Sequence, residues 1–241
     1  MNKSEFIKLH SKHFRKRIGQ IKYVIIHCST RTPKDIVDLL DELGLSAHYI
    51  IGRDGLVIEN VDPKNVAFHA GQSSWKNSLE YSLNEYSIGI ELEAPNMGQD
   101  KNDYTDIQIK KLCELLEHLT NLYGIDKKDI LGHSDVAPTR KPDPGFCFPW
   151  KYLYDNGFGV WYENNSLYDS NDEKELFNII GYDTSDLCAT RYAFCRHFFT
   201  KEVEAFKDVK YLVDNPYPFD FKPNDFNGYM TTLKSVAKNL A

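Results

Sequence analysis

Short β-branched runs alternate with helical stretches along residues 20–150, and this alternation constrains the fold more than any other feature. The run Lys22–Cys28 (KYVIIHC) predicts a buried strand, and the run Tyr86–Glu93 (YSIGIELE) predicts a second strand in which apolar and polar residues alternate. Between them, Thr32 suits an N-cap and Pro33 suits the first helical position, so we expect a helix that ends near Gly44.

A predicted hairpin decides the strand directions. Residues 47–51 and 56–59 are apolar runs on either side of Gly52-Arg53-Asp54-Gly55, and an Asp-Gly pair between such runs is a strong turn signal. Thr105 and Gln108 match a capping box that opens a second, longer helix ending at Gly124. The fold class we expect is α/β, with a mixed central β-sheet flanked by helices.

The 241-residue chain divides into three predicted regions. Residues 1–20 are basic and predict a helical leader, and residues 21–155 form the α/β domain. Residues 156–241 predict a small all-helical C-terminal domain, with helices in three stretches, 175–180, 187–199 and 225–240.

Charge and hydropathy exclude some partners. Because 35 acidic residues outnumber 29 Lys and Arg, nucleic acid is not an expected partner. No apolar run is long enough to span a bilayer, and no export signal precedes the first strand. We therefore expect a cytoplasmic monomer with reduced cysteines; the alternative is a periplasmic or outer-membrane-associated protein whose leader was trimmed.

Two histidines and one carboxylate form a candidate metal site. His27 closes the first strand, His133 follows the short apolar run at 130–132, and Asp143 lies ten residues later between two prolines. Two imidazoles and a carboxylate leave a fourth tetrahedral position open, as catalytic zinc requires, and such a site can lower the pKa of bound water to about 7. Spacing alone also permits a chance arrangement.

Two further residues could assist this chemistry. Lys141 projects to the same side of an extended loop as Asp143 and could stabilise an oxyanion, although a plain surface lysine fits the spacing as well. Glu91 lies on the polar face of its strand and could act as a general base. Glu93 shares that face, so a glycosidase with two carboxylates, or a solvent-facing strand, also fits.

Several motifs occur in an order that carries a family resemblance. They are Ile26-His27-Cys28-Ser29, SAHYII at 46–51, Arg53-Asp54-Gly55, Phe68-His69-Ala70-Gly71, IGIELE at 88–93 and GHSDVAPTRKPDPG at 132–145. Together they resemble the zinc-dependent N-acetylmuramoyl-L-alanine amidases of the AmpD and AmiD type. These are relatives of phage amidase lysozymes and peptidoglycan recognition proteins.

The resemblance implies a function and a set of roles. The expected reaction is zinc-dependent hydrolysis of the amide between N-acetylmuramic (or anhydro-N-acetylmuramic) acid and L-alanine in peptidoglycan or muropeptides. The alternative is a non-catalytic peptidoglycan-recognition module. The implied zinc ligands are His27, His133 and Asp143; the implied catalytic residues are Glu91 and Lys141; the implied substrate-groove residues are His69 and Trp75.

Two further positions do not carry a single implied role. His48 matches a motif position that fits either a helper near the site or a structural hydrogen bonder. Cys28 stands where the AmpD subgroup often has asparagine, so the resemblance does not imply the substrate hydrogen bond of that asparagine here.

The helical tail has a weaker likeness to a known module. LFNIIGYD at 176–183 followed by AFCRHF at 193–198 resembles the three-helix peptidoglycan-binding module that some AmiD-type enzymes carry. Residues 156–241 are therefore expected to be peptidoglycan-binding-like.

Overall fold

A six-stranded mixed sheet forms the centre of the molecule. The computed structural model describes residues 6–76, 82–163, 166–205 and 208–241. The strand order is β1-β5-β4-β7-β3-β8, in which β4 and β5 are antiparallel and all other neighbours are parallel. The strands are β1 (Ile7–Lys8), β3 (Tyr23–Ser29), β4 (Tyr49–Ile51), β5 (Val57–Glu59), β7 (Ser87–Glu93) and β8 (Ile130–Gly132). The expected fold class is confirmed.

One face of the sheet is covered by a long helix. Helix α2 (Asp106–Tyr123) packs Leu112, Leu115 and Leu116 against the apolar face of β3 and β7. Thr105 accepts a hydrogen bond from the backbone N–H of Gln108 at 3.3 Å, and Gly124 ends the helix with a φ of 67°. The Gln108 side chain does not complete the capping box, because its amide donates to the carbonyls of Ile51 and Glu93.

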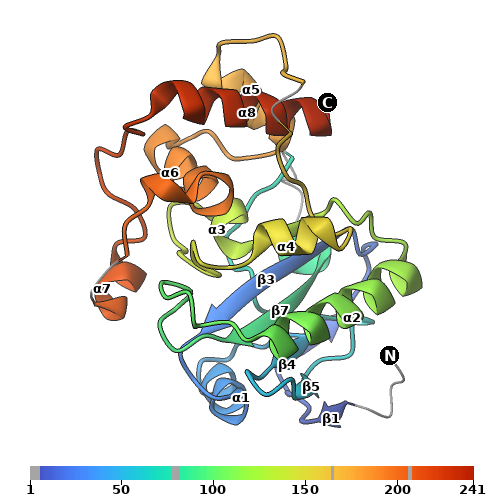
Figure 1. The fold of residues 1–241 in the computed structure, drawn as a ribbon. Coiled ribbons are helices and arrows are strands. Elements are labelled where there is room, and N and C mark those ends of the chain that lie inside the picture. Colours follow the sequence, from blue (N-terminus) through green and yellow to red (C-terminus); the bar gives the residue numbers. More distant parts are fainter. Residues whose placement is uncertain (1–5, 77–81, 164–165, 206–207) are drawn as a thin grey trace.

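The other face of the sheet is covered by two separate groups of helices. Helix α1 (Pro33–Glu42) packs Ile36 against Ile50 and Ile58 of the hairpin strands. The C-terminal helices cover Tyr23 and Ile25 at the beginning of β3. The carboxyl ends of β3 and β7 lie between these two groups (Figure 1).

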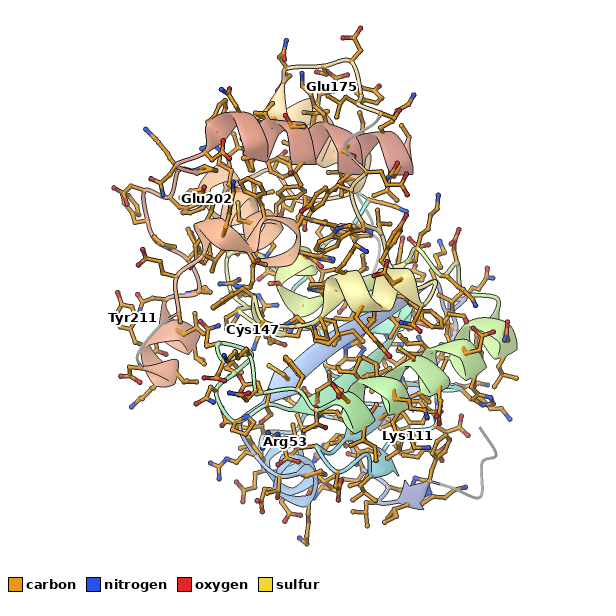
Figure 2. All side chains as sticks on the ribbon, in the orientation of Figure 1. Arg53, Lys111, Cys147, Glu175, Glu202 and Tyr211 are labelled. Carbon is orange, nitrogen blue, oxygen red and sulfur yellow. The ribbon has the colours of Figure 1, made fainter. Side chains whose placement is uncertain are left out.

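The C-terminal region is helical, as expected. Its elements are α5 (Glu173–Ile180), α6 (Leu187–Phe198), a 3-10 turn (Thr200–Glu202), α7 (Val209–Asp214) and α8 (Phe226–Leu240). Short helices α3 (His133–Val136) and α4 (Trp150–Asp155) precede them. One hydrophobic cluster joins Leu131 and Val136 to Phe177, Phe194 and Leu233, and side chains fill the layer between the two parts (Figure 2). The division at residue 155 stays a prediction, and the core crosses it.

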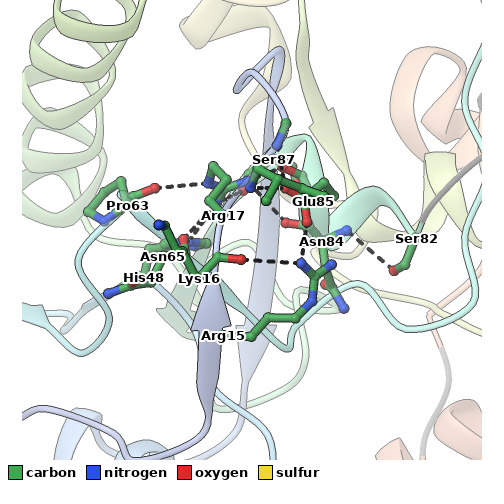
Figure 3. Close-up of polar contacts among 12 residues, drawn as sticks. Arg15, Lys16, Arg17, His48, Pro63, Asn65, Ser82, Asn84, Glu85 and Ser87 are labelled. Atoms are coloured by element: carbon green, nitrogen blue, oxygen red, sulfur yellow. Dashed lines mark hydrogen bonds and ion pairs between the residues drawn. The ribbon is translucent and has the colours of Figure 1, made fainter.

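The prediction of a helix over residues 1–20 is wrong in the part that the structure describes; residues 1–5 lie outside it. Residues 7–8 form β1, and residues 14–16 form β2 (Phe14–Lys16), which pairs with β6 (Asn65–Ala67). The reason is that the two arginines make long-range contacts: Arg15 pairs with buried Glu85, and Arg17 donates to five backbone carbonyls (Figure 3). The basic run therefore holds the N-terminal segment, with strand β2, against the α/β domain.

No helix among the described residues combines the length and the apolar character that crossing a bilayer requires.

Candidate active site

Two neighbouring strands place the first pair of candidate residues side by side. In the parallel register of β3 and β7, His27 is the partner of Glu91. Paired residues of adjacent strands project to the same face, here the face that α2 does not cover. Residues Ile88, Ile90 and Leu92 point to the opposite, apolar face, as the sequence predicted.

The third strand brings the second histidine to the same edge. Strand β8 pairs with β3 and leads directly into the one-turn helix α3, whose first residue is His133. The loop that follows returns Asp143 to this point, where its carbonyl accepts the N–H of Ser134 at 2.8 Å.

The three candidate ligands meet in space. His27 Nδ1 lies 2.8 Å from His133 Nδ1, and Asp143 Oδ2 lies 3.3 Å and 2.9 Å from these two nitrogens. Each of the three residues is at least 93% buried. Donors around tetrahedral zinc stand roughly 3.3 Å apart when the bonds are about 2.0 Å long. The spacing of these atoms fits a single small cation.

A hydrogen-bond relay assigns the tautomer of His27. The Ser87 hydroxyl donates to the Leu83 carbonyl at 2.6 Å, so its oxygen accepts from His69 Nε2 at 3.3 Å. His69 Nδ1 then carries a lone pair and accepts the Nε2 proton of His27 at 2.9 Å. His27 Nδ1 is consequently unprotonated and faces the other two donors.

His133 has the same tautomer for a simpler reason. Its Nε2 lies 3.2 Å from the Ala70 carbonyl, which can only accept, so the proton is on Nε2 and the lone pair is on Nδ1. Two bare nitrogens and a carboxylate oxygen therefore face one another without a proton between the imidazoles. A cation between these atoms would relieve their mutual repulsion. In metal sites, a ligating histidine typically donates its other ring N–H to a hydrogen-bond acceptor, as His27 and His133 do here.

Electrostatics keep the site ready for a metal at neutral pH. Burial, together with neighbouring His133, lowers the pKa of His27 to about 4, and burial with nearby His27 lowers the pKa of His69 well below its usual range. Burial alone would raise the pKa of Asp143, but His133 and His27 hold it well below its ordinary value. Neutral imidazoles and an ionised carboxylate are the protonation states that bind metal.

Glu91 is held in an environment that favours proton exchange. Burial and the charge of Asp143 raise the pKa of Glu91 to about 8, while the charge of Lys141 lowers it. Its Oε2 atom has no hydrogen-bond partner within the described part of the chain. A general acid and base needs a pKa near the working pH, so Glu91 has the properties of one.

A cavity joins these residues to solvent. It is lined by His27, His69, Glu91, His133, Lys141 and Asp143 on its polar side, and by Cys28, Met97, Leu39, Leu40, Leu45 and Val213 among its apolar residues. Cys28 is buried, and burial raises the pKa of its thiol well above its usual value. The Cys28 side chain thus stays a neutral thiol beside the site.

Three other residues that the sequence singled out lie elsewhere. His48 is fully buried; its Nδ1 accepts from the Gly89 N–H at 2.9 Å and its Nε2 faces Asn65 and Arg17 (Figure 3). These contacts hold the His48 ring inside the fold, and a helper role near the site stays a prediction. Trp75 is 4% exposed and packs on Tyr182, outside the cavity, and a role for it in substrate binding stays a prediction.

Glu93 is the remaining carboxylate of this strand. It accepts the N–H of Arg53 at 3.1 Å and does not line the cavity with Glu91. Glu91 and Glu93 therefore do not face one cavity, as the two carboxylates of a glycosidase would.

Sequence reasoning missed the residues that orient the ligands. Ser87 and the carbonyls of Leu83 and Ala70 anchor the histidines, and Gly89 provides the space for His69: a Cβ at this position would lie 2.4 Å from its ring. The single available signal was a glycine in the middle of a strand pattern, which often marks a close approach.

The fold and this site point to one class of protein. The chain matches the N-acetylmuramoyl-L-alanine amidase family over residues 17–146, which is more than half of its length. It therefore belongs to this family.

Individual relatives agree with this assignment. The chain is 31% identical to the amidase AmiD of Escherichia coli, over 59% of this chain and 55% of AmiD. It is 41% identical to the 1,6-anhydro-N-acetylmuramyl-L-alanine amidase AmpD of Escherichia coli, over 45% and 56% of the two chains. The matches thus span about half the length of these curated relatives.

A solved structure shares the whole fold. Escherichia coli AmiD, in complex with anhydro-N-acetylmuramic acid-L-Ala-D-γ-Glu-L-Lys, superposes with a TM-score of 0.69, covering 95% of this chain and 98% of AmiD at 22% identity. The likeness extends over the C-terminal helices, which the family match at residues 17–146 does not include.

Proposed function

We propose that this protein is a zinc-dependent hydrolase that cleaves the amide bond between N-acetylmuramic or anhydro-N-acetylmuramic acid and L-alanine. The observation that carries the proposal is the convergence of His27, His133 and Asp143 beside Glu91 and Lys141 in one cavity, in a member of the amidase family. The relatives whose names specify an anhydro-muramyl substrate support a muropeptide as the substrate.

The donor set fits zinc, and the residues around it have separate tasks. His27, His133 and Asp143 would hold a zinc ion, which would supply water activation and carbonyl polarisation. Glu91 takes a proton from the attacking water and returns it to the leaving nitrogen, as its raised pKa allows. The Lys141 ammonium stabilises the negative charge that develops on the carbonyl oxygen.

The test compares two glutamates of the same strand. Glu91→Gln should lower muropeptide turnover by a factor of about 10² to 10⁴, because a proton carrier is lost. Glu93→Gln, the matched control, should keep the rate within about threefold, since Glu93 lies outside the cavity. Turnover is followed by mass spectrometry of the released peptide, which also separates an amidase from a glycosidase that would release reducing sugar ends.

Metal analysis provides the second arm of the test. The purified protein should hold one equivalent of zinc, and a chelator should abolish turnover until zinc is restored. A protein that binds muropeptide but holds no metal and releases no peptide would instead be a recognition module.

A further inference from the structure

A buried carboxylate behind the metal site is held by the C-terminal helices. Asp135 is 1% exposed and does not line the cavity. Its carboxylate accepts three hydrogen bonds, from the Gly132 N–H at 2.7 Å, from His197 Nδ1 at 2.9 Å and from the Tyr182 hydroxyl at 2.6 Å. Two of these three donors belong to the helical region after residue 155.

The orientation of His197 is fixed by its neighbours. The ring is 5% exposed and stacks on Trp150 with a centroid distance of 3.9 Å and an interplanar angle of 16°. Helix α6, which carries His197, contacts α3 (Figure 1). The preceding residue, Arg196, is also buried and reaches the Lys141 carbonyl at 3.5 Å. Two consecutive residues of α6 thus contact the segment that carries His133 and Asp143: His197 at Asp135 and Arg196 at Lys141.

The contacts of Asp135 lead directly to the metal ligands. Gly132, whose N–H the carboxylate binds, immediately precedes His133. The next N–H of the same helical turn, from Ser134, donates to the backbone carbonyl of Asp143 at 2.8 Å. Moving Asp135 would therefore move the backbone of two of the three ligands.

We propose that His197 is a positioning residue of the metal site: through Asp135 it fixes the backbone that presents His133 and Asp143. In this arrangement the helical region completes the site from behind. The inference rests on the proposed function in one respect, namely that these side chains bind zinc.

The experiment replaces the hydrogen-bond donor and keeps the stacked ring. His197→Phe preserves an aromatic ring on Trp150 but removes the donor to Asp135. Outer-sphere changes typically weaken metal binding by about 10- to 100-fold, so we expect the Kd for zinc, measured by competition with a chelating dye, to rise by about tenfold. His197→Asn, which keeps an N–H close to the position of Nδ1, should restore most of the affinity. His10→Phe, at an exposed histidine, should leave the Kd unchanged.

A second readout does not depend on metal. In metal-free protein, the Gly132 amide should exchange with solvent at least about tenfold faster in His197→Phe than in wild type or His197→Asn, because its acceptor is no longer held. A folded His197→Phe protein with wild-type zinc affinity and wild-type Gly132 exchange would overturn the inference. Should this variant not fold, Tyr182→Phe removes the other anchor of Asp135 and is judged by the same two measurements.

The two proposals can fail separately. A wild-type protein that binds zinc but releases no peptide from muropeptides would refute the proposed function. The Kd for zinc of wild type and of His197→Phe would still test the role of His197. If wild-type protein binds no zinc, Gly132 exchange decides on the role of His197 alone.

Discussion

At the scale of single residues, the candidate metal ligand His27 is oriented by side chains that lie outside the ligand set. His27 is oriented by His69, which is oriented by Ser87, and the relay ends on a backbone carbonyl. The ring of His69 occupies the space that Gly89 leaves open in β7. A strand-centre glycine usually weakens a strand, so its presence here has a local reason.

This packing gives a testable prediction for Gly89. A methyl group at this position would lie 2.4 Å from the His69 ring, so Gly89→Ala should destabilise the protein by about 1–3 kcal/mol in urea denaturation. In a His69→Ala background the same substitution should cost much less, because the crowding partner is gone. An equal loss of stability in both backgrounds would show that His69 is not the cause.

At the scale of elements, the carboxylate of Glu173 connects three C-terminal helices through hydrogen bonds. Glu173 at the start of α5 accepts from Arg191 of α6 at 2.9 Å and 2.5 Å and from the Tyr229 hydroxyl of α8 at 2.7 Å. Burial opposes ionisation of Glu173, but these hydrogen bonds outweigh it and lower its pKa. A group with a lowered folded-state pKa stabilises the fold above its unfolded-state pKa, and this contribution is lost as the pH falls through the folded-state pKa.

The consequence can be measured with a neutral isostere. Glu173→Gln should lower the free energy of unfolding by about 1–3 kcal/mol at pH 7, and the difference from wild type should shrink at acidic pH, as the carboxyl group of wild type becomes protonated. Glu175→Gln, on the exposed side of the same helix (Figure 2), is the control and should have little effect at either pH. A pH-independent difference would contradict the role given to the charge.

At the scale of the whole molecule, the helical region and the sheet share a core. Tyr23, Ile25 and Leu131 of the sheet belong to the same buried cluster as residues of α5, α6 and α8. A shared core couples the unfolding of its parts, whereas separate domains unfold independently. The family match ends at residue 146, so this coupling joins the amidase region to helices beyond it.

We therefore predict a single cooperative unfolding transition. Tryptophan fluorescence and far-UV circular dichroism should give coincident urea curves for the full chain, because Trp75 and Trp150 lie where the two parts meet. Two resolved transitions would instead support an independent helical domain. The parts of the chain before and after residue 155 would then unfold independently of each other.

Much of this architecture was predictable because it is encoded locally. The strand at Tyr23–Ser29, the hairpin around Gly55 and the helix ending at Gly124 follow from periodicity and turn chemistry, which act over a few residues. The N-terminal segment was predicted wrongly because its basic run resembles a solvated helix. Its strands depend on partners at residues 57–67 and on Glu85, which no local pattern reveals.

The sequence alone determined the order of strands and helices, the family and the side chains that can bind a metal, because motifs and periodicities are properties of short segments. Only the tertiary structure decided that His27 and His133 both present Nδ1, that His48 and Trp75 are buried away from the cavity, and that α6 contacts Asp135. These features arise from contacts between residues that are far apart in the chain, and such contacts depend on how all the elements pack together.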